Sequence, residues 1–486
     1  MTAKERRAYK KENKQKKREK KDRNRQFAFV TYSFVAVFLC LIGYLVYFNV
    51  VRADEVVRSP YNARQDNYAK YITRGTIYDR NMEVLAETVK AEDGSEARVY
   101  PYGDLYSHVV GYNVHGKAGL ESTLNFDLLT SNAFILDKIK ADFADEKQPG
   151  DSAVTTLDTS LQQAAYNALG SFNGAVVAIE PSTGKILAWV SKPSFDPNQV
   201  SAQWEGLNSD ENSVLINRVS NGSYAPGSTF KLVTTLEYMR ENPDTYGNYT
   251  YDCSGVIDYN GVSIACYNNT AHGHEDLGNS VAYSCNTSFS NIGLSLNQDR
   301  FQKTAEELLF EKKLPGGFGN TVSHTGITAA ASDGDKMMTA MGQGKVQVSP
   351  YHMALITAAI ANGGELMTPY LLDYTQNNGG SVVEKKMPKS YGALMTAAEA
   401  SQLKEYMKQV VDYGTASNLG RGGYDVAGKT GTAEYSDEME KNHSWFVGFS
   451  NMDNPDLVVS VVIEKSDGAG RATDVAGAVF DQYYNQ

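Results

Sequence analysis

Apolar and polar positions recur with different periods along this chain, and each period predicts an element. Residues 27–48 run without a single charge, and the hydrocarbon core of a bilayer needs about 20 such residues. Ser160–Leu169 and 397–411 repeat apolar residues with helical spacing, whereas 349–363 is apolar on nearly every side. The pattern predicts one membrane-spanning helix and a large folded region with amphipathic and buried helices.

Short apolar runs predict strands at both ends of the region that begins at Asp151. The runs 175–179 and 186–190 flank a turn, as in a β-hairpin, and three more runs lie at 426–434, 444–450 and 457–464 before a terminal helix from Asp474. We expect one antiparallel sheet, built from both ends of the region and flanked by helices, which is an α+β fold. Further expectations are a charged helix at 131–148, a polar loop at 194–220, a strand-rich excursion at 250–270 and a helix at 277–296.

The first 26 residues are strongly basic, with 13 Lys and Arg against 4 Asp and Glu, although the whole chain carries a net charge of −11. Such a tail can indicate nucleic-acid binding, but this one leads directly into the uncharged run, and basic flanks of membrane helices stay in the cytoplasm. A cleaved signal peptide is the alternative, but no A-x-A-like cleavage site follows Val51. We expect a cytoplasmic tail at 1–26, a single-pass anchor at 27–48 in the cytoplasmic membrane, an extracytoplasmic remainder and no nucleic-acid partner.

Cysteine and histidine spacing gives little indication of a metal. Cys253 and Cys266 would face an oxidising exterior, where they could pair across a short loop, and two free thiols are the open alternative. His272 and His274 are too close together to suggest a zinc site, and no Cys/His cluster shows ligand spacing along the sequence. We therefore expect neither a metal nor another cofactor.

One serine stands at the start of a predicted helix, with a lysine one turn later. Ser228 and Lys231 follow a Pro-Gly turn and would share one face of the first helical turn. A serine hydroxyl is a poor nucleophile until a base removes its proton, and a lysine kept neutral by burial or nearby positive charge can be that base. The same S-x-x-K spacing recurs at 182–185 and 401–404, so the spacing alone decides nothing.

Two further motifs follow Ser228 in chain order. Ser284 and Asn286 form S-x-N around Cys285, and Lys429-Thr430-Gly431-Thr432 lies on a predicted strand. A glycine in a strand lets another backbone approach closely. The combination of S-x-x-K, S-D-N and K-T-G is typical of penicillin-binding proteins and β-lactamases.

With these motifs in this order, the chain resembles the penicillin-binding proteins, and more narrowly the class B, monofunctional D,D-transpeptidases. Residues 74–80 (RGTIYDR) and 119–121 (GLE) look like N-terminal signatures of that family, and 224–228 (YAPGS) looks like its lead-in to the nucleophile. The resemblance covers most of 52–486. It implies a penicillin-binding/serine β-lactamase-like transpeptidase domain that cross-links peptidoglycan stem peptides through an acyl-enzyme and is a target of β-lactams.

The resemblance also assigns residue roles. Ser228 would be the nucleophile, Lys231 the base for acylation, and Ser284 a proton relay to the leaving nitrogen, with Lys429 tuning the last two electrostatically. Asn286 would hold the amide of the donor peptide, and the backbone N–H groups of Ser228 and Thr432 would form the oxyanion hole. The Thr430 and Thr432 hydroxyls would hold the terminal carboxylate of the substrate. The strand through Gly431 would pair with the extended peptide.

The resemblance divides the remainder into a strand-rich pedestal at 49–150 and a transpeptidase domain at 151–486. About 100 residues are too few for a glycosyltransferase domain of ordinary size. The expected partners are therefore D-Ala-D-Ala stem peptides, β-lactam antibiotics, the cytoplasmic membrane and a SEDS-type polymerase that makes the glycan strands.

Other functions remain open at this point. A β-lactamase would need a group that activates water, and no deacylating Glu motif is evident. A D,D-carboxypeptidase fits the three motifs but not the N-terminal signatures. A β-lactam sensor or scaffold, which acylates without turnover, usually carries further membrane spans.

Overall fold

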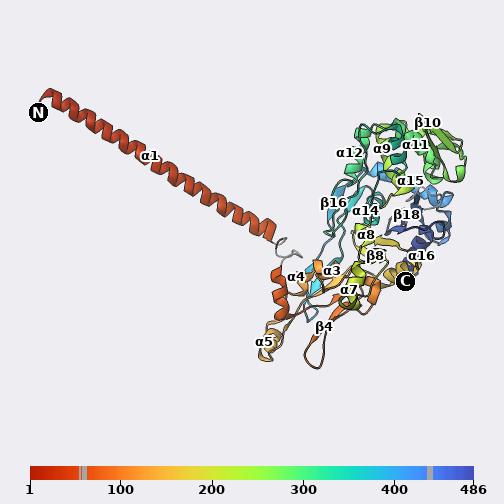
Figure 1. Cartoon of the computed structure of the whole chain (residues 1–486), viewed down its shortest axis with the longest axis horizontal. Helices are drawn as coiled ribbons and strands as arrows, with labels where there is room; N and C mark the ends of the chain where they lie inside the picture. The colour runs from red at the N-terminus through yellow and green to blue at the C-terminus, as the bar shows by residue number, and fades with distance from the viewer. Residues whose placement is uncertain (54–55, 57–62, 435–441, 486) are drawn as a thin grey trace. The chain divides into compact units, whose positions relative to one another are not determined.

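The structure, a computed structural model, describes residues 1–53, 56, 63–434 and 442–485, and the chain forms two compact units, Met1–Gln65 and Asp66–Gln486. In the first unit, helix α1 (Ala3–Tyr47) continues into a π-helical turn, Phe48–Arg52 (Figure 1, red). None of the side chains of α1 is buried within this unit. Among the described residues, Ala3–Arg52 is the helix long and apolar enough to cross a bilayer, as the charge-free run predicts.

The second unit is α+β and is built on an antiparallel sheet. Among the described residues, five strands form this sheet in the order β17-β18-β19-β7-β8. Because β19 pairs with β7, the late strands and the early hairpin join as the sequence predicts. Strand β17 lies at the edge and is paired on one side, with β18. The bounds are Gly174–Ile179 (β7), Ile186–Lys192 (β8), Val426–Glu434 (β17), Asn442–Ser450 (β18) and Leu457–Ile463 (β19).

Helices cover this sheet on both faces. The strands β7, β8 and β19 are therefore buried along their whole length. Helix α14 (Pro350–Ala361) packs against β7, β18 and β19, and every one of its residues is buried, which explains why it is apolar all round. Helices α6 (Thr159–Leu169) and α16 (Ala472–Tyr484) pack on each other and on β8, β18 and β19. Helix α15 (Ala397–Asp412) lies along the edge strand β17.

A second sheet links the N-terminal region to the rest of this unit. Among the described residues its order is β15-β14-β6-β2-β3-β4, with β2 and β6 parallel and the other pairs antiparallel. Strands from both sides of the expected boundary at 150 therefore share one sheet, and the position of that boundary stays a prediction. The bounds are Ile77–Tyr78 (β2), Val84–Lys90 (β3), Glu96–Val99 (β4), Ser152–Thr155 (β6), Leu372–Gln376 (β14) and Val382–Lys385 (β15).

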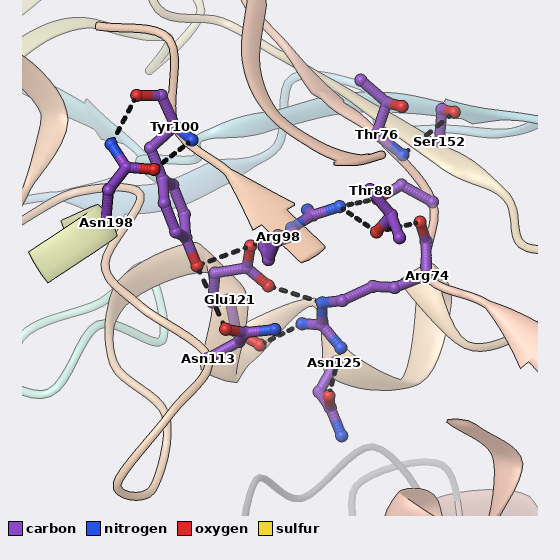
Figure 2. A network of polar contacts seen from close by, with 11 residues as sticks. Arg74, Thr76, Thr88, Arg98, Tyr100, Asn113, Glu121, Asn125, Ser152 and Asn198 are labelled. Atoms are coloured by element: carbon purple, nitrogen blue, oxygen red, sulfur yellow. Dashed lines mark hydrogen bonds and ion pairs between the residues drawn. The ribbon is translucent and has the colours of Figure 1, made fainter. Parts of the chain in front are cut away.

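A buried ion-pair network joins the two N-terminal signatures of the sequence. Arg74 Nε lies 2.5 Å from one carboxylate oxygen of Glu121, and Arg98 Nε lies 2.7 Å from the other. Arg74 also donates to Asn125 Oδ1 at 2.6 Å, and the Tyr100 hydroxyl donates to Glu121 (Figure 2). Burial raises the pKa of Glu121, but the charges of Arg98 and Arg74 outweigh it and hold that pKa below its ordinary value. The signatures are therefore structural partners of each other.

Two sequence expectations are corrected by the structure. The polar loop at 194–220 contains helices α7 (Val200–Asn208) and α8 (Arg218–Asn221), because Val200 packs in a small cluster with Phe195 and Val214 that polarity alone does not show. The helix expected at 277–296 is broken into α10 (Leu277–Ala282) and α11 (Asn286–Ser295).

The strand-rich excursion at 250–270 is confirmed and extends to 276. Strand β9 (Thr250–Cys253) pairs with β12 (Gly273–Asp276), and β10 (Val256–Tyr259) pairs with β11 (Val262–Ala265). We call residues 250–276 the cysteine lobe. The remaining elements are η2 (Ala63–Lys70), β1 (Ile72–Thr73), η3 (Gly103–Tyr106), α3 (Gly119–Thr123), α4 (Asn125–Leu128), α5 (Ile135–Phe143), β5 (Gln148–Pro149), η4 (Pro197–Gln199), η6 (Tyr246–Asn248), η7 (Tyr267–Asn269), α12 (Gln298–Glu307), α13 (Asp333–Ala340), β13 (Glu365–Met367), β16 (Ser390–Ala393) and η8 (Ser417–Arg421).

Candidate active site

Ser228 lies in a tight turn pressed against the edge strand of the main sheet. The turn is a 3-10 helix, η5 (Gly227–Phe230), which leads into α9 (Lys231–Glu241), so the predicted helical turn begins in 3-10 form. Gly227 has φ +54°, and a Cβ atom there would lie 2.3 Å from the carbonyl oxygen of Thr432. Only glycine allows both that backbone conformation and that approach. The half-buried Ser228 is thereby held beside β17.

Lys231 begins α9 with its side chain fully buried. Its Nζ atom donates to the backbone oxygen of Ser284 at 2.6 Å and to Asn286 Oδ1 at 2.8 Å. Burial lowers the pKa of Lys231 to about 8, because an ammonium ion is poorly solvated there. An uncharged amine, which can accept a proton, is therefore accessible near neutral pH.

Ser284 lies at the break between α10 and α11 in a left-handed backbone conformation, with φ +58°. L-residues other than glycine avoid this region, and such residues cluster at functional sites. Its hydroxyl oxygen accepts a hydrogen bond from Lys429 Nζ at 2.8 Å and lies 3.4 Å from Lys231 Nζ. The unusual backbone therefore places one hydroxyl between two amines.

Lys429 lies on β17 and is fully buried. Burial lowers the pKa of Lys429 well below its ordinary value, and the neighbouring Lys231 lowers it further. The amines of Lys231 and Lys429, both with lowered pKa values, flank the Ser284 hydroxyl. The three groups form a short path along which a proton can move.

The rest of the K-T-G-T motif lines the open edge of β17. A Cβ atom on Gly431 would lie 2.8 Å from the carbonyl oxygen of Pro226, so this glycine also permits the close approach of the serine turn. The Thr430 hydroxyl is hydrogen-bonded to the Thr415 hydroxyl at 2.6 Å, and Thr432 is exposed. Hydroxyl groups thus lie next to Ser228, together with a strand edge that no other described strand pairs with.

The structure separates this serine–lysine pair from the two other S-x-x-K pairs. Lys185 lies at the turn of the β7–β8 hairpin and pairs with Asp373 at 3.4 Å, and Lys404 lies on α15 over the Phe449 ring. A surface hollow lined by Trp204 and its neighbours also contains none of the predicted site residues. Among the described residues, the three predicted motifs meet at Ser228 alone.

Two neighbours of the site are absent from the sequence prediction. Gln343 Nε2 lies 3.4 Å from the carbonyl oxygen of Thr432, and Thr415 holds Thr430. For Gln343 a signal exists: it stands between two glycines, and a Cβ atom on Gly342 would lie 2.1 Å from the carbonyl oxygen of Gly227. Thr415 has a similar signal, because it follows Gly414, where a Cβ atom would lie 2.3 Å from the carbonyl oxygen of Ala282.

Comparisons with known proteins agree with this geometry. A family model described as the penicillin binding protein transpeptidase domain matches residues 174–485, and one described as the penicillin binding protein A dimerisation domain matches residues 74–153. Peptidoglycan D,D-transpeptidase PbpA of Mycolicibacterium smegmatis is 30% identical over 476 residues, which cover 93% of this chain and 95% of that relative.

The chain belongs to the penicillin-binding protein transpeptidase family. Penicillin-binding protein A from M. tuberculosis, solved as a ceftriaxone acyl-enzyme complex, matches this transpeptidase with a TM-score of 0.78 and 27% identity over 87% of this chain and 99% of that chain. The D,D-transpeptidase domain of a peptidoglycan glycosyltransferase from Eggerthella lenta matches with a TM-score of 0.74 and 31% identity over 85% and 99%. The predicted fold and the serine-type D,D-transpeptidase class are confirmed.

The structure has the cysteines of the transpeptidase as free thiols, one of the two alternatives that the sequence leaves open. Cys253 and Cys266 are free thiols whose sulfur atoms lie 3.8 Å apart, too far for the S–S bond of about 2.05 Å. With His272 and Cys285 they form a cluster whose donor atoms all lie within 4.8 Å of one another. Sequence spacing missed this cluster because the cysteine lobe folds back onto the start of α11.

Proposed function

We propose that this transpeptidase cross-links peptidoglycan stem peptides through an acyl-enzyme on Ser228. One observation carries the proposal: Lys231, Ser284, Asn286 and Lys429 form one hydrogen-bonded set beside the Ser228 turn, although they come from three distant stretches of the chain. Acyl transfer needs a nucleophile and a base that takes its proton, and a hydroxyl next to the base can pass that proton to the leaving group.

In the first half-reaction, Ser228 Oγ attacks the carbonyl carbon of the penultimate D-alanine, and its proton passes to the neutral amine of Lys231. The negative charge that develops on the carbonyl oxygen is stabilised by the backbone N–H groups of Ser228 and Thr432. The C–N bond then breaks, and the leaving D-alanine nitrogen receives a proton through the Ser284 hydroxyl, which lies between Lys231 and Lys429.

In the second half-reaction, an amine of a neighbouring stem peptide attacks the ester carbon. The amine loses a proton to the same base, the ester C–O bond breaks, and Ser228 Oγ regains its proton. The new amide bond is the cross-link. Lys231 and Ser284 thus act in both directions, as the reversal of a proton path requires.

The donor peptide binds along the open edge of β17. An extended peptide added to a sheet edge gains affinity from backbone hydrogen bonds, and the side chains beside that edge select which peptide binds. Thr430 and Thr432 hold the terminal carboxylate with their hydroxyls, Gly431 leaves room for the peptide backbone, and Asn286 holds the donor amide. Asn286 is fixed for this task because its Nδ2 donates to the Ala265 carbonyl oxygen at 3.0 Å.

Product analysis tests this reaction directly. Full-length protein in detergent is given glycan strands that carry D-Ala-D-Ala stem peptides, and free D-alanine and cross-linked peptides are measured. We expect both products from the wild type and neither from Ser228→Ala. Ser401→Ala, which removes the serine of an S-x-x-K pair on α15, is the matched control and retains both. D-alanine release without cross-links would instead indicate a carboxypeptidase.

We also propose that the protein works in the cytoplasmic membrane, with residues 1–26 inside, beside a SEDS-type polymerase that supplies glycan strands. The basic tail before the apolar part of α1 supports this orientation. The polymerase follows from the family resemblance, and co-purification of the two co-expressed full-length proteins tests it. Failure to co-elute in mild detergent, with both proteins folded, would contradict the partnership.

A further inference from the structure

Three cysteines and one histidine converge next to the proposed active site. Cys253 ends β9, Cys266 follows β11, His272 precedes β12, and Cys285 caps α11. The three cysteines are at most 3% exposed, and His272 is half-buried. Their donor atoms all lie within 4.8 Å of one another. The cluster therefore ties three parts of the cysteine lobe to the S-x-N motif.

The spacing of these donors matches a tetrahedral metal centre. Two Zn–S bonds of about 2.3 Å at the tetrahedral angle place their sulfur atoms about 3.8 Å apart. In the structure the sulfur of Cys266 lies 3.8 Å from that of Cys253 and 3.7 Å from that of Cys285. The Nδ1 atom of His272 lies 3.4 Å from the sulfur of Cys253. These separations match those expected between ligands of one tetrahedral ion.

The chemistry of the set selects the ion. Three thiolates and one imidazole form a closed, soft donor set that suits Zn²⁺ and disfavours Mg²⁺ or Ca²⁺. The Thr287 hydroxyl lies 3.2 to 3.6 Å from the three sulfur atoms, and the backbone N–H of Ser288 points at Cys285 Sγ at 3.4 Å. Such donors stabilise coordinated thiolates. The ring of His272 is held in orientation by stacking on Tyr283 at a 9° interplanar angle.

We propose that Cys253, Cys266, His272 and Cys285 bind a structural Zn²⁺ ion that fixes the cysteine lobe against the Ser284–Asn286 turn. All four positions of the tetrahedron are filled by protein, so the ion itself takes no part in acyl transfer.

The ion would also affect acyl transfer, and this part of the proposal rests on the proposed function. Cys285 stands between Ser284, whose backbone is left-handed, and Asn286, and both of these neighbours accept hydrogen bonds from Lys231. A metal bond to Cys285 would hold that strained turn in place. The ligands are thus positioning residues for Ser284 and Asn286.

Metal analysis of the full-length protein tests the site. The protein is purified in detergent through a metal-free affinity tag, without chelator, and its zinc is measured by mass spectrometry. We expect about one zinc per chain, its loss in Cys253→Ser and Cys266→Ser, and its retention in Cys40→Ser, the matched control in the membrane helix. His272→Cys should retain zinc as a four-cysteine set, whereas His272→Ala should lose it.

Folded wild-type protein that contains no zinc, and takes up none when Zn²⁺ is added, would overturn the proposal. A mass lower by two hydrogens under non-reducing conditions would instead identify a disulfide between two of the cysteines. If Cys253→Ser and Cys266→Ser fail to fold, the zinc content of the wild type and the response of its thermal unfolding to a chelator still decide the question.

The positioning role has its own measurement, the rate of acylation by benzylpenicillin per folded molecule. We expect zinc-depleted protein to acylate about 10- to 100-fold more slowly and to recover when Zn²⁺ is restored, with Ser228 still the labelled residue. An unchanged rate would leave a zinc site without that role. Label that persists in Ser228→Ala would contradict the proposed function but not the zinc site, so the two failures are distinguishable.

Discussion

At the scale of single residues, two buried lysines converge on Ser284. Lys231 and Lys429 are fully buried, and burial lowers the pKa of each. The sites at Ser228, Lys231 and Lys429 could be predicted from sequence because their motifs occur together in the family that the chain resembles. The left-handed backbone of Ser284 could not, since it depends on contacts made by both of its neighbours.

The lowered pKa of Lys231 predicts a pH dependence of acylation. Because burial lowers this pKa to about 8, the amine is mostly protonated below that pH and cannot accept the proton of Ser228. The acylation rate should rise about tenfold per pH unit as pH increases toward 8 and level off above it. A fluorescent penicillin and stopped-flow mixing measure this rate between about pH 6 and pH 9, and a flat profile would contradict the role of Lys231.

Gly227 predicts a second residue-scale effect. Gly227→Ala adds a left-handed strain of about 1–2 kcal/mol and a contact of 2.3 Å with the carbonyl oxygen of Thr432, so the serine turn must move away from β17. We expect acylation to fall at least about 100-fold. Gly363→Ala is the control, because that glycine has φ +67° with nothing within 4 Å. It should lose about 1–2 kcal/mol of stability through the same left-handed strain and acylate normally; equal rates in both variants would be inconsistent with this account.

At the scale of elements, regular periodicity predicted the main sheet and several of the helices that pack on it. Helices α6, α14 and α15 and the five strands of the main sheet lie where the pattern places them. The pattern fails where tertiary contacts decide, as in α7, whose Val200 is buried in a local cluster, and at the break between α10 and α11. The sequence did not predict the Cys/His cluster for the same reason: its members are separated by unequal loops and meet through the fold of the cysteine lobe.

The buried network of Figure 2 predicts a large stability effect in the N-terminal region. Glu121→Gln removes the one carboxylate between Arg74 and Arg98, and both arginines are at least nine-tenths buried. Leaving buried charges without their partner costs about 3–5 kcal/mol. Glu96→Gln breaks the more exposed pair with Lys147 and should cost at most about 1 kcal/mol. Chemical denaturation of both variants measures the difference, and similar losses would show that the network is not the main support of this region.

At the scale of the whole molecule, charge and hydropathy predict the membrane topology. Residues 1–26 carry most of their charge as Lys and Arg, and the charge-free run of α1 follows directly. Intact spheroplasts treated with external protease should lose 66–486 and retain the tail. A tag at each end, detected by antibody, reports which end is cut, with lysed cells as the control. Protection of the C-terminal tag and loss of the N-terminal one would reverse the proposed orientation.

The most direct test of the account is the intact mass of the full-length protein after brief exposure to benzylpenicillin. We expect an adduct of one drug molecule on the wild type and on Ser401→Ala, mapped by peptide digestion to Ser228, and none on Ser228→Ala. Rapid return to the free mass with hydrolysed drug would indicate a β-lactamase. An adduct that persists in Ser228→Ala, or no adduct on folded wild-type protein, would contradict the proposed nucleophile.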